Sequence, residues 1–370
     1  MSKKTSSNCI LAREVCQLKA LVRAQNKQLS LLVKQVKDDC KKGQPGSEDK
    51  ESTLRCLNPC IDSLQPDILY HLGIDTGSTN FPNVFGDVRF VCLSGPAQRA
   101  EKFASYFMEA IGLKLNAAVQ LKDMAVAGHR YAMFKAGPVL CVSHGIGGPS
   151  ISIVLNELIK MMHHAKCQDP VFIRIGSCGG LGMESGTVVI SKEAVNAELT
   201  PKYELIIHGK PVQLTAQLDA DLAKELLSVA DSYKTDYNTI LGKTMCANEF
   251  YEGQSRLDGA FCEYTIEGKK AYLQKLADNS VTNIEMESVP FAALTHRAGI
   301  RAAVVCFTIL NRLESDQITA SPETMNRWQA RPQELIARYI RKSIYGSLDE
   351  CEEHDEELKK CDCDENPEGC

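Results

Sequence analysis

Hydrophobic residues in the middle of the chain gather in short runs that alternate with longer, helical stretches. The runs are rich in Val, Ile, Phe and Cys, which favours β-strands. They occupy residues 88–93, 139–143, 171–175, 187–190 and 302–310. Residues 150–163 have a helical pattern instead. The alternation of strands with helices predicts an α/β layered fold for the body of the chain, residues 53–345.

The N-terminal region, residues 1–52, has a different pattern from the body. From Leu11 to Val36 the apolar positions step by alternating four and three, with polar Gln25 in the one gap, and this spacing predicts a heptad helix. Residues 41–50 then predict a flexible linker. Such a helix would either join subunits as a coiled coil or fold back on the body alone. A basic targeting peptide is a third alternative, which Glu14 opposes.

The C-terminal segment, residues 346–370, is acidic and contains cysteines, so it predicts a disordered tail. Cys351, His354, Cys361 and Cys363 carry side chains of metal-binding types, but their spacing fits no common zinc motif. We therefore expect no metal site.

Composition narrows the class of protein. The chain has 370 residues, 44% hydrophobic and 24% charged, which is typical of a soluble globular protein. Its net charge of -5 gives no general attraction to nucleic acid or to an anionic membrane. The longest apolar runs are far shorter than the ~20 residues that cross a bilayer, so no membrane span is expected.

The cysteines indicate the compartment. The chain contains 16 of them, and Cys92, Cys141 and Cys306 lie inside predicted strands, as small buried thiols do in a reducing environment. The N-terminus lacks the layout of a signal peptide. We therefore expect a cytoplasmic protein.

Three predicted strands end in Gly-rich turns, at residues 94–99, 144–149 and 176–182. Ligands of α/β folds bind at such strand ends. Two of the turns combine guanidinium groups, a hydroxyl and Gly-permitted backbone N–H donors, which together suit a tetrahedral oxyanion. These groups belong to Gly95, Arg99, Arg174 and Ser177. The alternative is a pair of tight turns with surface arginines. Arg174 opposes it, because an unpaired charge inside an apolar run would be costly.

Residues 250–256 place a ring, an amide and a guanidinium on one short segment. Phe250 offers a face for a planar base, and the Gln254 amide matches the N3–H and O2 edge of uracil. Arg256 would then reach O4. Taken alone, the segment is better explained as a Gly-containing turn with a solvated Arg, so other segments must decide.

A pair of carboxylates, Glu285 and Glu287, would share one side of an extended segment. Glu287 could accept hydrogen bonds from the two hydroxyls of a ribose diol. The alternative is a solvated pair at the start of a helix. Cys178 has no evident His partner, so we interpret it as structural.

Together these segments resemble the eukaryotic type of uridine phosphorylase, within the nucleoside phosphorylase superfamily. The resemblance runs in order from residue 57 to residue 332 and includes 67–74, 173–180, 250–256 and 284–288. It implies a three-layer α/β fold with a central mixed sheet flanked by helices. It also implies reversible phosphorolysis of uridine to uracil and ribose-1-phosphate, a reaction of pyrimidine salvage. Inorganic phosphate would be a co-substrate, with no other cofactor and no metal.

The resemblance further implies a role for individual residues. Phosphate would be bound by Gly95, Arg99, Arg130, Arg174 and Ser177. Ribose would be bound by His71, Met286 and Glu287. Uracil would be bound by Gly179, Phe250, Gln254, Arg256, Ile309, Leu310 and Arg312. Arg312 would lie on a loop that closes over the pocket.

The same resemblance implies that His71 and Arg130 come from the neighbouring subunit, so that a homodimer is the smallest active unit. Catalysis would depend on Arg99, Arg174, Gln254, Arg256 and Glu287. Ser177 departs from the Thr that is usual in the family, but it keeps the hydroxyl.

Two alternatives for the function remain. A nucleosidase or a purine nucleoside phosphorylase would share the fold, although the phosphate arginines oppose water as the nucleophile and Gln254 with Arg256 favours a pyrimidine. A catalytically silent paralogue would bind nucleoside without cleaving it.

Overall fold

The computed structural model of the protein describes residues 54–111 and 121–346. The predicted heptad helix, its linker and the acidic tail lie outside the described residues. The boundaries predicted at residues 52/53 and 345/346 therefore stay predictions.

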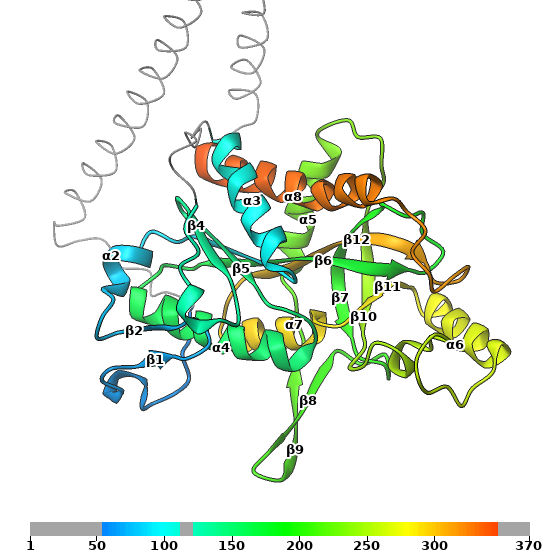
Figure 1. Cartoon of the computed structure of the whole chain (residues 1–370), viewed down its shortest axis with the longest axis horizontal. Coiled ribbons are helices and arrows are strands. Elements are labelled where there is room, and N and C mark those ends of the chain that lie inside the picture. The colour runs from blue at the N-terminus through cyan, green and yellow to red at the C-terminus, as the bar shows by residue number, and fades with distance from the viewer. Residues whose placement is uncertain (1–53, 112–120, 347–370) are drawn as a thin grey trace, which may run out of the picture. The chain divides into compact units, whose positions relative to one another are not determined.

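An eight-stranded mixed sheet forms the centre of the described chain (Figure 1). Its strands are buried runs of β-branched, aromatic and Cys residues, which suit a sheet covered on both faces. In spatial order they are β11 (Val281–Glu285), β10 (Thr239–Cys246), β7 (Val188–Val195), β12 (Ala302–Asn311), β6 (Val171–Gly180), β3 (Phe90–Ser94), β5 (Val139–Ser143) and β4 (Met133–Ala136).

Strand directions make the sheet mixed. β12 lies parallel to β6 and antiparallel to β7, and β4 lies antiparallel to β5. β11 pairs with β10 and also, in the antiparallel sense, with the end of β6. This second pairing curls one half of the sheet on itself, so the ends of β6 and β11 meet.

Helices cover both faces of the sheet (Figure 1). On one face α3 (Ala97–Ala110), α5 (Ala220–Asp231) and α8 (Pro322–Tyr345) bury apolar residues in a common core cluster. On the other face α2 (Phe81–Phe85), α4 (Gly148–Ala165) and α7 (Ser288–Arg297) contribute to a second cluster. α6 (Ile266–Asp278) packs beside β11. The predicted three-layer α/β fold is confirmed.

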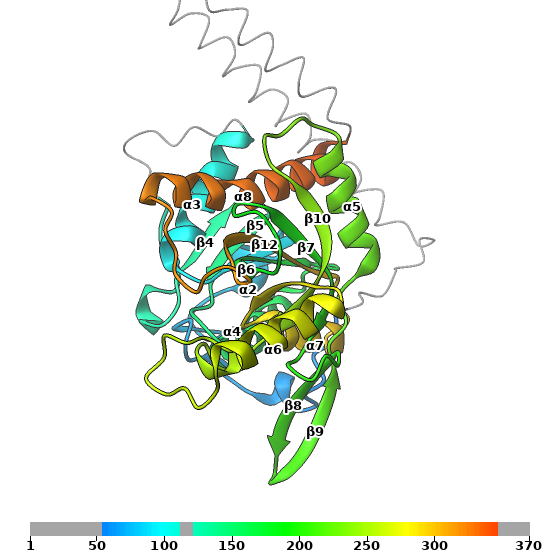
Figure 2. The ribbon, with the colours of Figure 1, turned by 90° about the vertical axis from the view of Figure 1, so that its right-hand side faces the viewer.

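Smaller elements complete the described chain. Two hairpins are formed by β1 (Ile68–Leu69) with β2 (Ile74–Asp75), and by β8 (Lys202–Ile207) with β9 (Lys210–Thr215). The second hairpin projects from the body (Figure 2). Short 3₁₀ helices are η1 (Ile61–Ser63), η2 (Val126–Gly128) and η3 (Glu252–Gln254).

Helix starts fall into two groups. Asn80, Asp219, Thr265 and Ser321 cap α2, α5, α6 and α8 by accepting a hydrogen bond from a backbone N–H in the first turn. The side chains that precede α3, α4 and α7, among the described residues, form no such cap. Carboxylates from elsewhere serve two of these starts: the N–H of Ser288 in α7 donates to Glu285, and the N–H of Gly147 before α4 donates to Glu287.

The prediction of a Gly-rich turn at residues 176–182 was wrong over most of its length. β6 continues as a strand to Gly180, because residues 176–180 pair with β12 and the last two also pair with β11. The glycines of this strand leave space for neighbouring side chains. A Cβ at Gly176 would collide with the Arg174 guanidinium, and a Cβ at Gly179 would lie 2.6 Å from Cγ of Arg312. Two arginine side chains can therefore lie across this strand.

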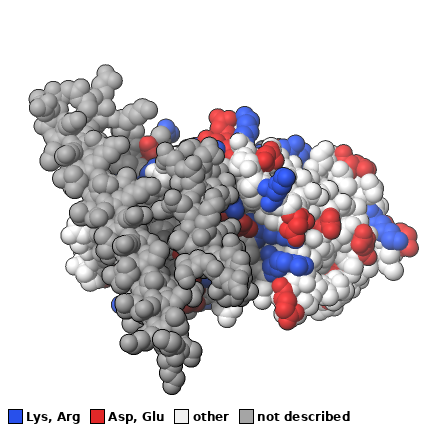
Figure 3. Space-filling model, turned by 90° about the horizontal axis from the view of Figure 1, so that it is seen from above, with Lys and Arg blue, Asp and Glu red and all other residues white. Residues whose placement is uncertain are grey.

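The surface charges and the apolar character of the helices bear on the class of protein. On the part of the surface visible in Figure 3, basic and acidic side chains are intermixed. No helix among the described residues is long and apolar enough to cross a membrane.

The core makes a direct stability prediction. Phe103 of α3 is 1% exposed, whereas Tyr106 on the same helix is 39% exposed. Phe103→Ala should lower the free energy of unfolding by about 3–5 kcal/mol, because it leaves a cavity in the core. Tyr106→Ala, which removes a ring of similar size at the surface, is the control. Denaturant unfolding of both variants measures the difference, and equal losses would contradict this description of the core.

Candidate active site

A cavity of about 450 Å³ opens where the carboxyl ends of β3, β5, β6, β11 and β12 meet. This is the sheet edge at which the sequence predicted ligand binding. The predicted site residues that line it are Gly95, Arg99, Arg174, Ser177, Gly179, Phe250, Gln254, Arg256, Met286, Glu287, Ile309, Leu310 and Arg312. Of the residues predicted for the site, only His71 and Arg130 lie elsewhere.

One end of the cavity is cationic. Arg99 from the first turn of α3 and Arg174 from β6 are both buried beside Gly95 and Ser177. The Arg99 guanidinium lies 5.5 Å from the centre of the Phe307 ring, and its Nε has no hydrogen-bond partner among the described residues. Burial, reinforced by the charge of Arg174, lowers the pKa of Arg99 to about 10. Arg99 thus remains a cation at neutral pH.

Two carboxylates neutralise Arg174. Its Nη1 lies 3.0 Å from Oε2 of Glu285, and its Nη2 makes a short contact with Oε2 of Glu287. Burial by itself would lower the pKa of Arg174, but the two carboxylates outweigh burial and raise it above its ordinary value. This pairing explains how a charge is accommodated inside an apolar strand.

Backbone groups hold the same two carboxylates in place. Glu285, at the end of β11, accepts hydrogen bonds from the backbone N–H groups of Glu287 (2.9 Å) and Ser288 (3.0 Å). Glu287 accepts a 2.6 Å hydrogen bond from the N–H of Gly147 at the start of α4. Burial opposes ionisation of Glu287, but the charge of Arg174 and the hydrogen bond from Gly147 outweigh it and lower its pKa. Glu287 is therefore an ionised acceptor rather than a solvated carboxylate.

His144 also lines the cavity, and the sequence analysis did not single it out. Its side chain is 1% exposed, and neither ring nitrogen has a hydrogen-bond partner among the described residues. Burial, with the charge of Arg174, lowers its pKa to about 3, so the ring is neutral. The sequence did contain a signal for this residue, because His144 is the first residue of the Gly-rich turn that follows β5. Its ring nitrogens remain available to a ligand.

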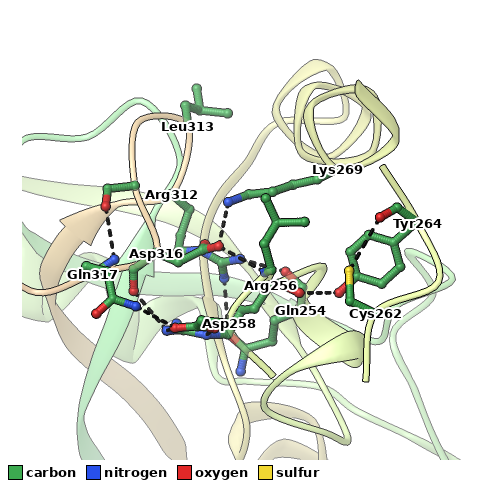
Figure 4. Close-up of polar contacts among 12 residues, drawn as sticks. Gln254, Arg256, Asp258, Cys262, Tyr264, Lys269, Arg312, Leu313, Asp316 and Gln317 are labelled. Atoms are coloured by element: carbon green, nitrogen blue, oxygen red, sulfur yellow. Dashed lines mark hydrogen bonds and ion pairs between the residues drawn. The ribbon is translucent and has the colours of Figure 1, made fainter. Parts of the chain in front are cut away.

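The other end of the cavity is a polar network (Figure 4). Arg256 donates from Nε and Nη2 to the carboxylate of Asp258, at 2.9 and 2.7 Å. Its guanidinium lies 4.5 Å from the centre of the Phe250 ring. Gln254 lies at the end of η3, 5% exposed, beside Arg256. The predicted base-reading residues are therefore brought together.

Arg312 begins the turn that follows β12, lines the cavity and is 1% exposed. The closing of this loop over the pocket stays a prediction. Nη2 of Arg312 donates to the backbone carbonyl of Gln254 at 2.7 Å and its Nη1 to Oε1 of Gln254 at 3.2 Å. The space for this side chain is left by Gly179.

The three helices without side-chain caps begin at this cavity. Gly95 and Pro96 precede α3, Gly145 and Ile146 lie just before α4, and Glu287 precedes α7, and all five line the cavity. Helix N-termini carry a partial positive charge and free N–H donors. The N–H of Ser288 at the start of α7 already donates to Glu285, so the starts of α3 and α4 are the ones that add to the attraction that Arg99 exerts on an anion.

His71 and Arg130 lie next to each other, away from the cavity of their own chain. A Cβ at Gly128 would collide with the His71 carbonyl, and the rings of His71 and Tyr131 are 6.4 Å apart. Arg130 is exposed, and the His71 side chain is partly exposed. The two segments form one surface that another molecule can reach.

Metal-ligand chemistry is not indicated in this region. Within residues 54–111 and 121–346, no group of three or more His, Cys, Asp or Glu side chains has an arrangement that could hold a metal ion. The four candidate ligands of the acidic tail lie outside the described residues.

Known proteins resemble this chain over most of its length. Uridine phosphorylase 1 of Mus musculus is 45% identical over 291 residues, which cover 79% of this chain and 93% of that protein. The inactive uridine phosphorylase B of Schistosoma mansoni is 35% identical and covers 78% of this chain and 96% of its own length.

The fold of a solved relative agrees. The crystal structure of uridine phosphorylase from Schistosoma mansoni in complex with thymidine superposes with a TM-score of 0.75 at 37% identity, covering 78% of this chain and 98% of that one. The family model described as the phosphorylase superfamily matches residues 89–341. This match spans the sheet, the whole cavity and, apart from α2 and the end of α8, the helices on both faces of the sheet, and the chain belongs to the phosphorylase superfamily.

Proposed function

We propose that the protein catalyses the reversible phosphorolysis of uridine to uracil and ribose-1-phosphate. One observation carries the proposal: a single cavity has a cationic end with Arg99 and a base-reading end with Gln254 and Arg256. The relatives named uridine phosphorylase support the same reaction. The structure of one of them holds thymidine, which is also a pyrimidine nucleoside.

Phosphate would bind at the cationic end. Gly95, Arg99 and Ser177 supply a close backbone approach, a charge and a hydroxyl, and the start of α3 adds N–H donors. Neutral His144 adds a ring N–H donor beside them. Arg174 contributes donors but little net charge, because Glu285 and Glu287 neutralise it. A phosphate dianion therefore calls for more positive charge than this chain supplies in its own cavity.

Arg130 would supply that charge from a partner subunit. It is exposed and belongs to the same surface as His71, which is the other residue expected to cross between subunits. Each site of a homodimer would then contain Arg99 from one chain, with Arg130 and His71 from the other. This division of residues explains why the two lie outside their own cavity.

Ribose would lie against Met286 and Glu287, between the two ends. One oxygen of Glu287 accepts from Gly147 and the other from Arg174, and each keeps a lone pair for a ribose hydroxyl. As the glycosidic bond breaks, positive charge develops on the sugar and negative charge on uracil. The Glu287 carboxylate and the phosphate face the sugar cation.

Gln254 and Arg256 would face the charge that appears on O2 and O4 of uracil, with Phe250, Gly179, Ile309 and Leu310 enclosing the ring. Preorganised donors of this kind are typically worth ~3 kcal/mol each in the transition state. No separate general acid is required, because the departing base leaves as a stabilised anion.

A reducing, cytoplasmic location is part of the proposal. Its support is that the cysteines of the described residues are all free, including Cys92 and Cys141, which face each other on neighbouring strands.

The first experiment measures uracil release from uridine by the purified full chain, with and without inorganic phosphate. Release should depend on phosphate and yield ribose-1-phosphate, while inosine should not be cleaved, because Gln254 and Arg256 suit a pyrimidine. Uridine cleavage that is undiminished without phosphate would indicate a nucleosidase. Uridine binding without turnover would indicate a silent paralogue, as in the inactive Schistosoma mansoni relative.

Shared active sites make a second prediction. Arg99→Ala and Arg130→Ala should each lose most activity as separate homodimers. Mixing the two chains after partial unfolding and refolding should restore activity to about a quarter of wild type, because half of the dimers are mixed and one of their two sites is intact.

Lys224→Ala, which removes an exposed cation on α5, is the control: alone it should keep full activity, and refolded in an equal mixture with either arginine variant it should keep about half, because its own dimers and one site of each mixed dimer are intact. Failure of the mixture to regain activity, while each variant remains folded and dimeric, would contradict the contribution of Arg130 from the partner subunit.

A further inference from the structure

Behind the residues that would contact uracil lies a second layer of charged side chains that the reaction described above does not use (Figure 4). Lys269 comes from α6, Asp316 from the segment after β12, and Asp258 from the segment after Arg256. None of the three was singled out from the sequence. Their contacts determine which atoms of Gln254 and Arg256 remain free.

Arg312 fixes the orientation of the Gln254 amide. An arginine has donors only, so the amide must turn its carbonyl oxygen, and not its NH₂ group, toward Nη1 of Arg312. The backbone carbonyl of Gln254 receives the other donor, Nη2, at 2.7 Å. Gln254 therefore keeps both N–H donors of its amide and one lone pair of Oε1 for a ligand.

Asp316 and Lys269 in turn fix Arg312. Oδ1 of Asp316 accepts from Nε of Arg312 at 3.0 Å, and Oδ2 accepts from Nζ of Lys269 at 2.6 Å. Burial opposes ionisation of Asp316, but Lys269, the Leu257 amide and Arg312 outweigh it and lower its pKa. Asp316 thus stays charged, and it links α6 to the base-reading residues.

Asp258 and Asp316 accept most of the hydrogen bonds that Arg256 can donate. The carboxylate of Asp258 accepts from Nε and Nη2 of Arg256, and the backbone carbonyl of Asp316 accepts a further 2.8 Å hydrogen bond from Nη2. The hydrogen bond from Arg256 lowers the pKa of Asp258. The Nη1 group of Arg256 is the part of the guanidinium without a protein acceptor among the described residues.

The atoms left free form a fixed pattern of donor, acceptor and donor: Nη1 of Arg256, Oε1 of Gln254 and Nε2 of Gln254. Uracil presents the complement, O4, N3–H and O2. Cytosine presents an NH₂ group and an unprotonated N3 in place of the first two, so two donors would meet at one position and two acceptors at the next. A site built to pair each polar atom rejects such an analogue strongly.

We propose that Lys269, Asp316 and Asp258 are positioning residues that set the preference of this site for uracil over cytosine. They act by holding Gln254 and Arg256 in the donor, acceptor and donor arrangement. This inference rests on the proposed function, because it names the selectivity of the same site.

The test uses Asp258→Asn and Lys269→Met in the full chain. We measure KM and kcat for uridine and for phosphate, and the binding of uracil and of cytosine by calorimetry in the presence of phosphate. Each variant should raise the KM for uridine and the Kd for uracil by about tenfold or more, as expected for loss of a charge-assisted hydrogen bond. The KM for phosphate should stay unchanged, and the preference for uracil over cytosine should fall by a similar factor.

Matched controls are Asp87→Asn and Lys243→Met. Asp87 pairs with Lys135 at 2.8 Å and Lys243 pairs with Glu193 at 3.3 Å, and neither pair touches the cavity. Lys269→Arg, which keeps the charge, should recover most of the selectivity lost in Lys269→Met. A merely structural role of Lys269 would instead lower stability, raise the KM values for uridine and for phosphate together, and leave the preference for uracil over cytosine unchanged.

The outcomes separate the two proposals. A wild-type chain without phosphate-dependent uridine cleavage removes the proposed function itself. The positioning role alone is overturned if the wild type is active and the folded Asp258→Asn and Lys269→Met variants keep its KM for uridine and its preference for uracil. Should Lys269→Met fail to fold, Asp258→Asn decides the result, since its side chain is 29% exposed and lies at the rim.

Discussion

The site of this protein depends on one buried ion pair, that of Arg174 with Glu285 and Glu287. It joins the strand β6 to the end of β11 and the start of α7, at the place where β11 folds back to pair with β6. Removing Arg174 would leave the two buried carboxylates without their counter-charge, and breaking a buried ion pair in this way typically costs about 3–5 kcal/mol. Because the backbone N–H groups of Gly147 and Ser288 bind the same carboxylates, the pair also fixes how α4 and α7 approach the cavity.

This arrangement has an electrostatic consequence. Arg174 lies at the end of the cavity where phosphate is proposed to bind, yet two carboxylates face its single charge, so attraction for an anion there would come from Arg99 and from the starts of α3 and α4. The capping pattern agrees, because helices that begin elsewhere satisfy their first turn with Asn, Asp, Thr or Ser, while α3 and α4 have no such side-chain cap and α7 is served by Glu285. The protein combines a rigid, ion-paired interior with the starts of α3 and α4 at the cavity.

Local sequence patterns predicted what depends on local physics. The run 139–143 matches β5 residue for residue, because a wholly buried strand needs only a short apolar run, and the carboxyl-end turns led to Arg99 and Arg174. The turn predicted at residues 176–180 failed, because glycines favour a turn locally while pairing with β11 and β12 makes them a strand. Asp316 and Lys269, 47 residues apart, carry no local signal of their contact, and the buried environment of His144 arises only when β3, β5 and β6 are assembled.

The surface that carries His71 and Arg130 is organised by the same helix that serves the cavity of its own chain. Glu157, in the middle of α4, accepts hydrogen bonds from the backbone N–H groups of His71 (3.0 Å) and Leu72 (2.9 Å), and lies 2.7 Å from Nδ1 of His71. With Nδ1 engaged, Nε2 is the nitrogen that a ligand in a neighbouring subunit would meet. The start of α4 contacts Glu287 in the cavity of its own chain, while its middle holds His71 at the surface. In the homodimer proposed above, a shift of α4 would therefore change both sites together.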